Sequence, residues 1–252
     1  MRAPNISFFH SAKPALVPGH YNKYQTAFTR LDLTVCLGVI IILGLLVFPI
    51  LAGSKTRSEQ VSCANNLRQI GVAYQSWGSS HDNGNPMRVL ISNGGMVPMG
   101  AGASWVVYAF IANYLGSPQV LVCPSDNRLI AKDFNSTSID GGFRHLNYRD
   151  NAVSYFVGLH ADFNEPMSLL SGDRDIHITA SPVSCSAGVN NAAGIYYLTD
   201  SQIGWNNKVH QQTGNILFTS GVVQQLGKQE LFSALSFSTN YLGSGAMHLL
   251  IP

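Results

Sequence analysis

The feature that most constrains this sequence is a long uncharged run near its N-terminus. Residues 33–54 contain no Asp, Glu, Lys or Arg, and most of the run reads LGVIIILGLLVFPILAG. As an α-helix the run would be about 33 Å long, compared with about 30 Å for the hydrocarbon core of a bilayer. It also lacks the polar face of a surface helix in a globular protein. The sequence therefore predicts a transmembrane helix.

The charges around this run are distributed unevenly. The basic residues before it are Arg2, Lys13, Lys23 and Arg30. Asp32 is the only acidic residue before it, and the formal charge of the whole chain is +2. Because Lys and Arg are enriched on the cytoplasmic side of membrane spans, we expect a cytoplasmic N-terminus and a periplasmic C-terminal domain at a bacterial inner membrane.

Composition and length exclude two other classes. Only 11% of residues are charged, too few for the basic face that nucleic-acid binding needs. A secretory signal peptide has an apolar stretch of about 7–15 residues followed by a small-residue cleavage site. Residues 33–54 form a longer run, and Gly53-Ser54-Lys55 passes directly into a polar, helix-like sequence. We expect no nucleic-acid partner and no such signal peptide.

The N-terminal border of the run, AFTRLDLTV at residues 27–35, resembles the signature of the type IV pilin-like family. This family comprises the pilins and the pseudopilins of type II secretion. The resemblance implies that a prepilin peptidase cleaves between Ala27 and Phe28 and that the new terminal amine is methylated. Ala27 replaces the usual Gly, Arg30 an apolar residue, and Asp32 the usual Glu.

The resemblance also implies how subunits assemble. The cation at the cleaved Phe28 terminus would pair with Asp32 of a neighbouring subunit, and each charge would compensate the desolvation of the other. Pro49 lies where many family members have a proline that loosens the helix. Gly38 and Gly44 would let neighbouring helices approach closely. The expected partners are the prepilin peptidase, membrane lipid, other pilin-like subunits and the inner-membrane assembly platform.

An amphipathic helix is expected to continue over residues 55–80. Its apolar positions follow spacings of 4, 3, 4 and 3 residues: Cys63, Leu67, Ile70, Tyr74 and Trp77. This period predicts a helix face that packs on a domain core. Turn residues at 81–86 end it.

The remaining chain predicts an α+β domain over residues 81–252. We expect a helix over 104–115, strands over 153–159, 176–180 and 195–198, and a hairpin that pairs 216–218 with 222–226. A helical turn over 228–235 and a docked apolar tail complete the pattern. The predicted fold class is α+β, with a long N-terminal helix, transmembrane in its first half, packed on a small antiparallel sheet.

Four further stretches resemble a pseudopilin-type subgroup of planctomycete and verrucomicrobial bacteria. They are CANNLRQIG at 63–71, VCPSD at 122–126, SGDR at 171–174 and GNILFTSGVVQ at 214–224. The resemblance implies the lollipop arrangement of a pilin and favours a Cys63–Cys123 disulfide, which an oxidising periplasm permits. Cys123 with Cys185 is the competing pair, and Cys36 lies within the apolar run.

The sequence shows no constellation of catalytic residues. CxxC, GxSxG, HExxH and P-loop patterns are absent, and no His/Cys spacing matches a zinc site. The acids at 162–165 and 173–175 lack the spacing of a calcium loop, so we interpret them as solvated turns. His210 is interpreted as a hydrogen-bonding loop residue. We expect no enzyme activity, no metal and no cofactor.

These features predict a cytoplasmic leader over residues 1–27, a transmembrane helix segment over 28–54, and the amphipathic segment and domain described above. The expected function is a structural pilin-like subunit of a type II secretion pseudopilus or a type IV pilus-like filament. The alternative is an uncleaved, single-pass anchored periplasmic binding domain. Replacing Asp32 would abolish assembly in the first case and leave binding unchanged in the second.

Overall fold

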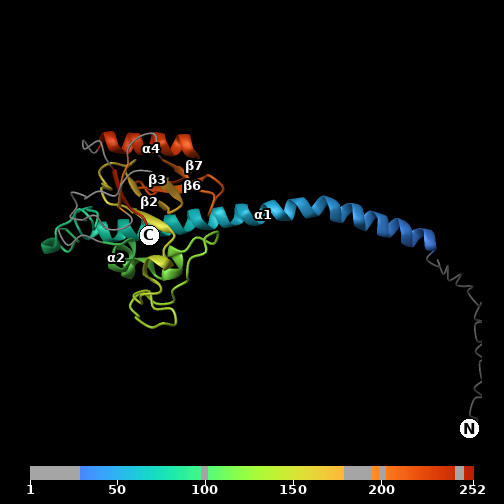
Figure 1. Cartoon of the computed structure of the whole chain (residues 1–252), viewed down its shortest axis with the longest axis horizontal. Coiled ribbons are helices and arrows are strands. Elements are labelled where there is room, and N and C mark those ends of the chain that lie inside the picture. The colour runs from blue at the N-terminus through green and yellow to red at the C-terminus, as the bar shows by residue number, and fades with distance from the viewer. Residues whose placement is uncertain (1–28, 98–101, 179–194, 199–202, 242–246) are drawn as a thin grey trace, which may run out of the picture. The chain divides into compact units, whose positions relative to one another are not determined.

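The computed structural model describes residues 29–97, 102–178, 195–198, 203–241 and 247–252 (Figure 1). For residues 46–55 only the helical backbone is described. The chain divides into two compact units, Met1–Pro49 and Ile50–Pro252, and each is treated by itself below. The leader over 1–27, the Ala27–Phe28 junction and Cys185 lie outside the described residues.

Helix α1 (Arg30–Ser79) is 50 residues long and contributes to both units. In the first unit its described large aliphatic side chains are exposed, from 50% for Leu37 to 71% for Leu45. Thr29, immediately before the helix, and Asp32, in its first turn, exchange hydrogen bonds at its start. Pro49 lies within α1, as expected, and the helical backbone continues through it.

The prediction of a membrane-spanning first half is contradicted. Among the residues that the structure describes, no helix is both long enough and apolar enough to cross a bilayer. From residue 57 onward α1 carries charged side chains such as Arg57 and Glu59.

The second unit contains a six-stranded antiparallel sheet with the order β4-β8-β1-β2-β6-β7. Its strands are β1 (Tyr155–Gly158), β2 (Leu169–Asp173), β4 (Ile195–Leu198), β6 (Gly214–Phe218), β7 (Val223–Leu226) and β8 (Met247–Leu250). A second, two-stranded sheet pairs β3 (Ile176–Ile178) with β5 (Ile203–Trp205). The α+β part of the fold prediction therefore agrees with the structure.

Short helices and turns surround the sheet. They are η1 (Ile91–Asn93), α2 (Ser104–Phe110), α3 (Ala112–Leu115), η2 (Pro118–Leu121), η3 (Arg149–Ala152) and α4 (Lys228–Tyr241). The single helix expected over 104–115 is divided at Ile111, whose backbone leaves the helical region at φ −92° and ψ 12°.

The two faces of the large sheet are buried by different elements. Helix α4 lies on one side of it, and the distal part of α1 lies on the other (Figure 1). Successive side chains of a strand point to opposite faces of the sheet, so neighbouring residues of one strand join different buried clusters. Tyr155 and Val157 join the cluster that includes α1, whereas Phe156 joins the cluster that includes α4.

The face of α1 predicted to contact a core is buried. Cys63, Leu67, Ile70 and Tyr74 are fully buried, and Trp77 is 3% exposed. Full burial of one large apolar side chain stabilises a fold by about 1.5–3 kcal/mol. This face therefore fixes α1 on the sheet and places Cys63 against the loop that follows η2.

Candidate functional site

A disulfide joins α1 to the loop that follows η2. It links Cys63 to Cys123, the pair implied by the pilin resemblance, across a sequence separation of 60. Both cysteines are fully buried. Asn66, also on α1, donates a hydrogen bond from Nδ2 to the carbonyl oxygen of Val122 at 3.0 Å. Two neighbouring contacts therefore hold this loop against the helix.

A partly buried ion pair holds the same loop beyond the disulfide. The Arg174 guanidinium donates from Nε and Nη2 to the two carboxylate oxygens of Asp126, each at 2.7 Å. Burial raises the pKa of Asp126, but the hydrogen bonds and charge of Arg174 outweigh it, and the net effect lowers the pKa. Asp126 is therefore a stable anion that ties the loop to the end of β2.

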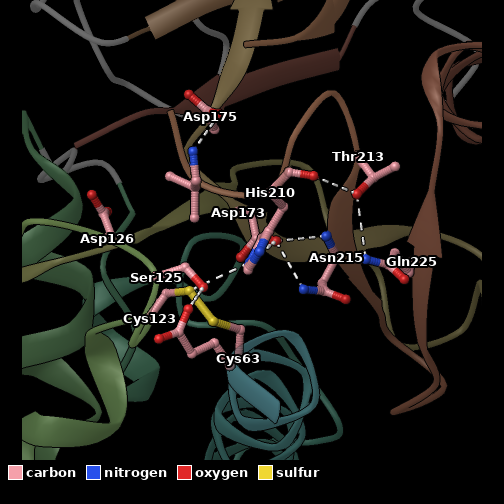
Figure 2. Close-up of polar contacts among 12 residues, drawn as sticks. Cys63, Cys123, Ser125, Asp126, Asp173, Asp175, His210, Thr213, Asn215 and Gln225 are labelled. Carbon is pink, nitrogen blue, oxygen red and sulfur yellow. Dashed lines mark hydrogen bonds and ion pairs between the residues drawn. A yellow bond between two sulfur atoms is a disulfide. The ribbon is translucent and has the colours of Figure 1, made fainter. Parts of the chain in front are cut away.

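Asp173, at the end of β2, lies close to the disulfide (Figure 2). Its Oδ2 accepts hydrogen bonds from the backbone N–H of Asn215 at 2.6 Å and from Asn215 Nδ2 at 2.9 Å. Burial raises the pKa of Asp173 to about 7. The other oxygen, Oδ1, is buried and has no hydrogen-bond partner among the described residues.

The loop between β5 and β6 brings His210 to the same place. The Oδ2 atom of Asp175 accepts hydrogen bonds from the backbone N–H groups of Lys208 and Val209, each at 3.0 Å. The hydroxyl of Thr213 donates to the carbonyl oxygen of His210 at 2.8 Å. These contacts hold the backbone on both sides of His210.

The imidazole of His210 contacts both the disulfide and the carboxylate. His210 Nε2 lies 3.4 Å from Cys123 Sγ and 3.4 Å from Asp173 Oδ2. Burial lowers the pKa of His210 and raises that of Asp173, so each side chain favours its neutral form. His210 Nδ1 is buried without a partner among the described residues. We call Cys63, Cys123, Asp173 and His210 the buried cluster.

The chemistry of the buried cluster is limited by its burial. The side chains of His210 and Asp173 are 0% and 1% exposed, so a substrate in solution cannot reach them. The ligand-type atoms of Cys63, Cys123 and His210 lie within 4.8 Å of one another. A metal, rather than a substrate, is the kind of ligand that such a group could hold.

The sequence did not predict that the four residues of the buried cluster lie together. His210 was expected to be a hydrogen-bonding loop residue, and Asp173 part of a solvated turn. Asp173 is instead buried, which corrects that interpretation. Its partners are far away in sequence, Asn215 by 42 residues, so no local spacing connects them. The only signal was that Asp173 and Asn215 both fall in stretches that resemble the pilin-like subgroup.

The assembly residues predicted from the sequence lie in the first unit, apart from this cluster. Thr29 donates to Asp32 Oδ2 from its backbone N–H at 3.0 Å and from its hydroxyl at 2.7 Å. The Asp32 N–H donates back to Thr29 Oγ1 at 3.2 Å. This reciprocal arrangement is a capping box, which the sequence analysis did not identify. Asp32 therefore helps to start α1, whatever its role between subunits.

Comparison of the chain with family models, with curated proteins and with solved structures found no match.

Proposed function

We propose that this chain is a structural subunit of a pilin-like filament, either a type II secretion pseudopilus or a type IV pilus-like fibre. A prepilin peptidase cleaves between Ala27 and Phe28, and subunits then associate through the first part of α1. Other pilin-like subunits and an assembly platform are the partners. The globular unit contributes no catalytic step.

The observation that carries the proposal is the exposed apolar surface of α1 over residues 31–45. Ten large aliphatic side chains in this segment are at least 50% exposed: Leu31, Leu33, Val35, Leu37, Val39, Ile40, Ile41, Ile42, Leu43 and Leu45. A contiguous surface of this kind is uncommon on a monomeric protein and marks an interaction site. Because it surrounds the helix, several neighbouring helices would be needed to cover it.

A copy of the same helix is a suitable partner for this surface. An added Cβ at Gly38 or Gly44 would meet no atom within 4 Å in this chain, so both sites are open to a neighbouring backbone. Small residues at such positions permit close packing of helices. The Asp32 carboxylate at the start of the segment can pair with the terminal amine that cleavage creates on a neighbour.

The disulfide supports an extracytoplasmic location for the globular unit. Structural disulfides persist in oxidising compartments such as the periplasm and are rare in the cytosol. The bond between Cys63 and Cys123 lies in the core, where it contributes to the folded structure. We therefore place the globular unit in the periplasm.

The proposal is tested by shearing cells that express the full chain and collecting filaments by ultracentrifugation. We expect the chain in the filament fraction of cells with an active prepilin peptidase and its absence from that fraction in cells with an inactivated peptidase. A chain that never enters the filament fraction would overturn the proposal. Equal recovery with and without the peptidase would overturn the processing step.

A further inference from the structure

Cys63, Cys123 and His210 hold their ligand-type atoms within 4.8 Å of one another, as the ligands of a metal ion would be. In a tetrahedral zinc site, Zn–S bonds of about 2.3 Å and Zn–N or Zn–O bonds of about 2.0 Å place neighbouring ligand atoms about 3.3–3.8 Å apart. His210 Nε2 is 3.4 Å from both Cys123 Sγ and Asp173 Oδ2. Two edges of a tetrahedron therefore exist already, and both meet at the imidazole nitrogen.

Burial and unsatisfied polar atoms also indicate a missing ligand. Asp173 is 1% exposed, yet its Oδ1 atom has no hydrogen-bond partner among the described residues. A buried carboxylate oxygen without a partner costs free energy, and a cation held beside the carboxylate would offset that cost. Figure 2 shows this carboxylate and the His210 ring beside the two sulfurs.

The sulfur atoms determine when a metal could bind. In the disulfide, neither Cys63 nor Cys123 carries a thiolate, which is the form of cysteine that binds metals. Reduction would produce two sulfurs on adjacent backbones, 4.9 Å apart at Cα. The same α1 face and the same loop contacts would hold them near His210.

We propose that the reduced protein binds one zinc ion through Cys63, Cys123, His210 and Asp173, and that disulfide formation and zinc binding are alternative states of this site. The reductant is a dithiol, which supplies two electrons and two protons to break the S–S bond and becomes a disulfide itself. Zinc binding then releases the two thiol protons to solvent. In the reverse direction a disulfide oxidant takes two electrons from the two thiolates and two protons from solvent, becomes a dithiol itself, and the metal is released.

The two states would serve the same structural purpose. Either the disulfide or the metal joins α1 to the loop at Cys123. The metal adds links to the segment that carries His210 and to β2 through Asp173 that the disulfide does not make. A chain whose cysteines are still reduced would thus keep the loop in place until it is oxidised.

The test uses the full chain carrying Cys36→Ser and Cys185→Ser, so that the other two thiols cannot bind metal. The protein is reduced with a phosphine, which competes weakly for metals, and titrated with Co²⁺ as a spectroscopic probe and then with Zn²⁺. We expect one Co²⁺ per chain with the visible absorption of a tetrahedral site and a thiolate-to-cobalt charge-transfer band, and displacement of Co²⁺ by Zn²⁺. The oxidised protein should show neither signal.

Variants assign the ligands. His210→Ala and Asp173→Asn should each weaken Co²⁺ binding at least about tenfold and alter the visible spectrum, because each removes or weakens one ligand. His177→Ala is the matched control, since this histidine is exposed on β3, and it should leave binding unchanged.

Three results would overturn the inference. They are the absence of saturable 1:1 binding in the reduced protein, the same spectrum in the oxidised protein, and an unchanged spectrum in a folded His210→Ala variant. Circular dichroism reports whether each variant is folded. If a variant is unfolded, the comparison of the reduced with the oxidised protein still tests the proposal, because both of these proteins keep His210 and Asp173.

Discussion

At the scale of single residues, Asp32 has two separable roles. Within the chain it closes a capping box with Thr29 at the start of α1. Between chains, we propose that its carboxylate pairs with the Phe28 amine of a neighbour. The first role needs the Thr29 hydroxyl and the second does not, so substitutions can distinguish them.

Asp32→Ala should abolish recovery in the filament fraction, and Thr29→Ala should not. The Thr29 change removes one helix cap, which costs about 1 kcal/mol of local stability, but leaves the carboxylate in place. Asp32→Glu, which introduces the residue that is usual in the family the sequence resembles and keeps the carboxylate, is the positive control. Recovery of Asp32→Ala at the level of the unchanged protein would contradict the pairing role.

At the scale of elements, the sequence predicted those parts of the fold that have a clear local pattern. The 4-3-4-3 spacing from Cys63 identified the buried face of α1, and the hairpin expected over 216–226 corresponds to β6 and β7. Strand β2 was missed because all five of its residues are buried, so it shows no alternation of polar and apolar residues. Gly172 lies within β2, and a glycine also weakens the sequence pattern that predicts a strand.

Helix α4 and strand β8 were underestimated for a related reason. The sequence predicted a helical turn over 228–235 and a docked tail, whereas α4 extends over Lys228–Tyr241 and Met247–Leu250 forms a strand between β4 and β1. Pairing of a C-terminal segment into the middle of a sheet is a long-range event, and no local signal reports it.

The first part of α1 yields a prediction about helix packing. Gly38→Leu should reduce recovery in the filament fraction at least about tenfold, because the side chain would separate helices that pack closely. Within the chain the change meets open space and removes the helix cost of glycine, about 1 kcal/mol, so the subunit should fold normally.

Gly102→Leu is the matched control in the globular unit, where an added Cβ also meets nothing within 4 Å. Normal recovery of this control, with loss of the Gly38 variant, would locate the effect on α1. Unimpaired assembly of Gly38→Leu would contradict close packing at that position.

A histidine pair between β8 and the loop after β1 yields a prediction about pH. His160 Nε2 lies 2.7 Å from His248 Nδ1. Burial, His248 and Arg88 together lower the pKa of His160 to about 4, and burial lowers that of His248. Because these histidines take up protons near pH 6.5 in the unfolded chain and only at lower pH in the folded chain, the contribution of this pair to stability should fall as the pH drops from about 6.5 to about 4.

The expected slope is below about 1 kcal/mol per pH unit, since His160 is only partly buried. Urea unfolding at several pH values should show that the stability of the unchanged protein declines relative to that of His160→Gln as the pH falls over this range. The exposed His177→Gln is the control and should follow the pH profile of the unchanged protein. Parallel pH profiles for all three proteins would contradict the role of the pair.

At the scale of the whole molecule, the globular unit depends on one long-range covalent link. The disulfide closes a loop between residues separated by 60 positions. Its entropic effect on the unfolded chain corresponds to about 4 kcal/mol at this loop length. The sequence could only suggest this pair by resemblance, since distances between α1 and the loop depend on how the helix packs.

Replacing both Cys63 and Cys123 by Ala should therefore lower the free energy of unfolding by about 4 kcal/mol. Denaturant unfolding of the full chain measures the change. Cys36→Ala, at an exposed position on α1, should have no such effect. A double variant as stable as the unchanged protein would show that the disulfide is dispensable for folding.

The central claim is that this chain is a processed subunit that assembles through the first part of α1. Intact-mass and N-terminal peptide mass spectrometry of the protein from cells with an active prepilin peptidase tests this claim most directly. The account predicts a chain that begins at methylated Phe28. A chain that still begins at Met1 in those cells would contradict it.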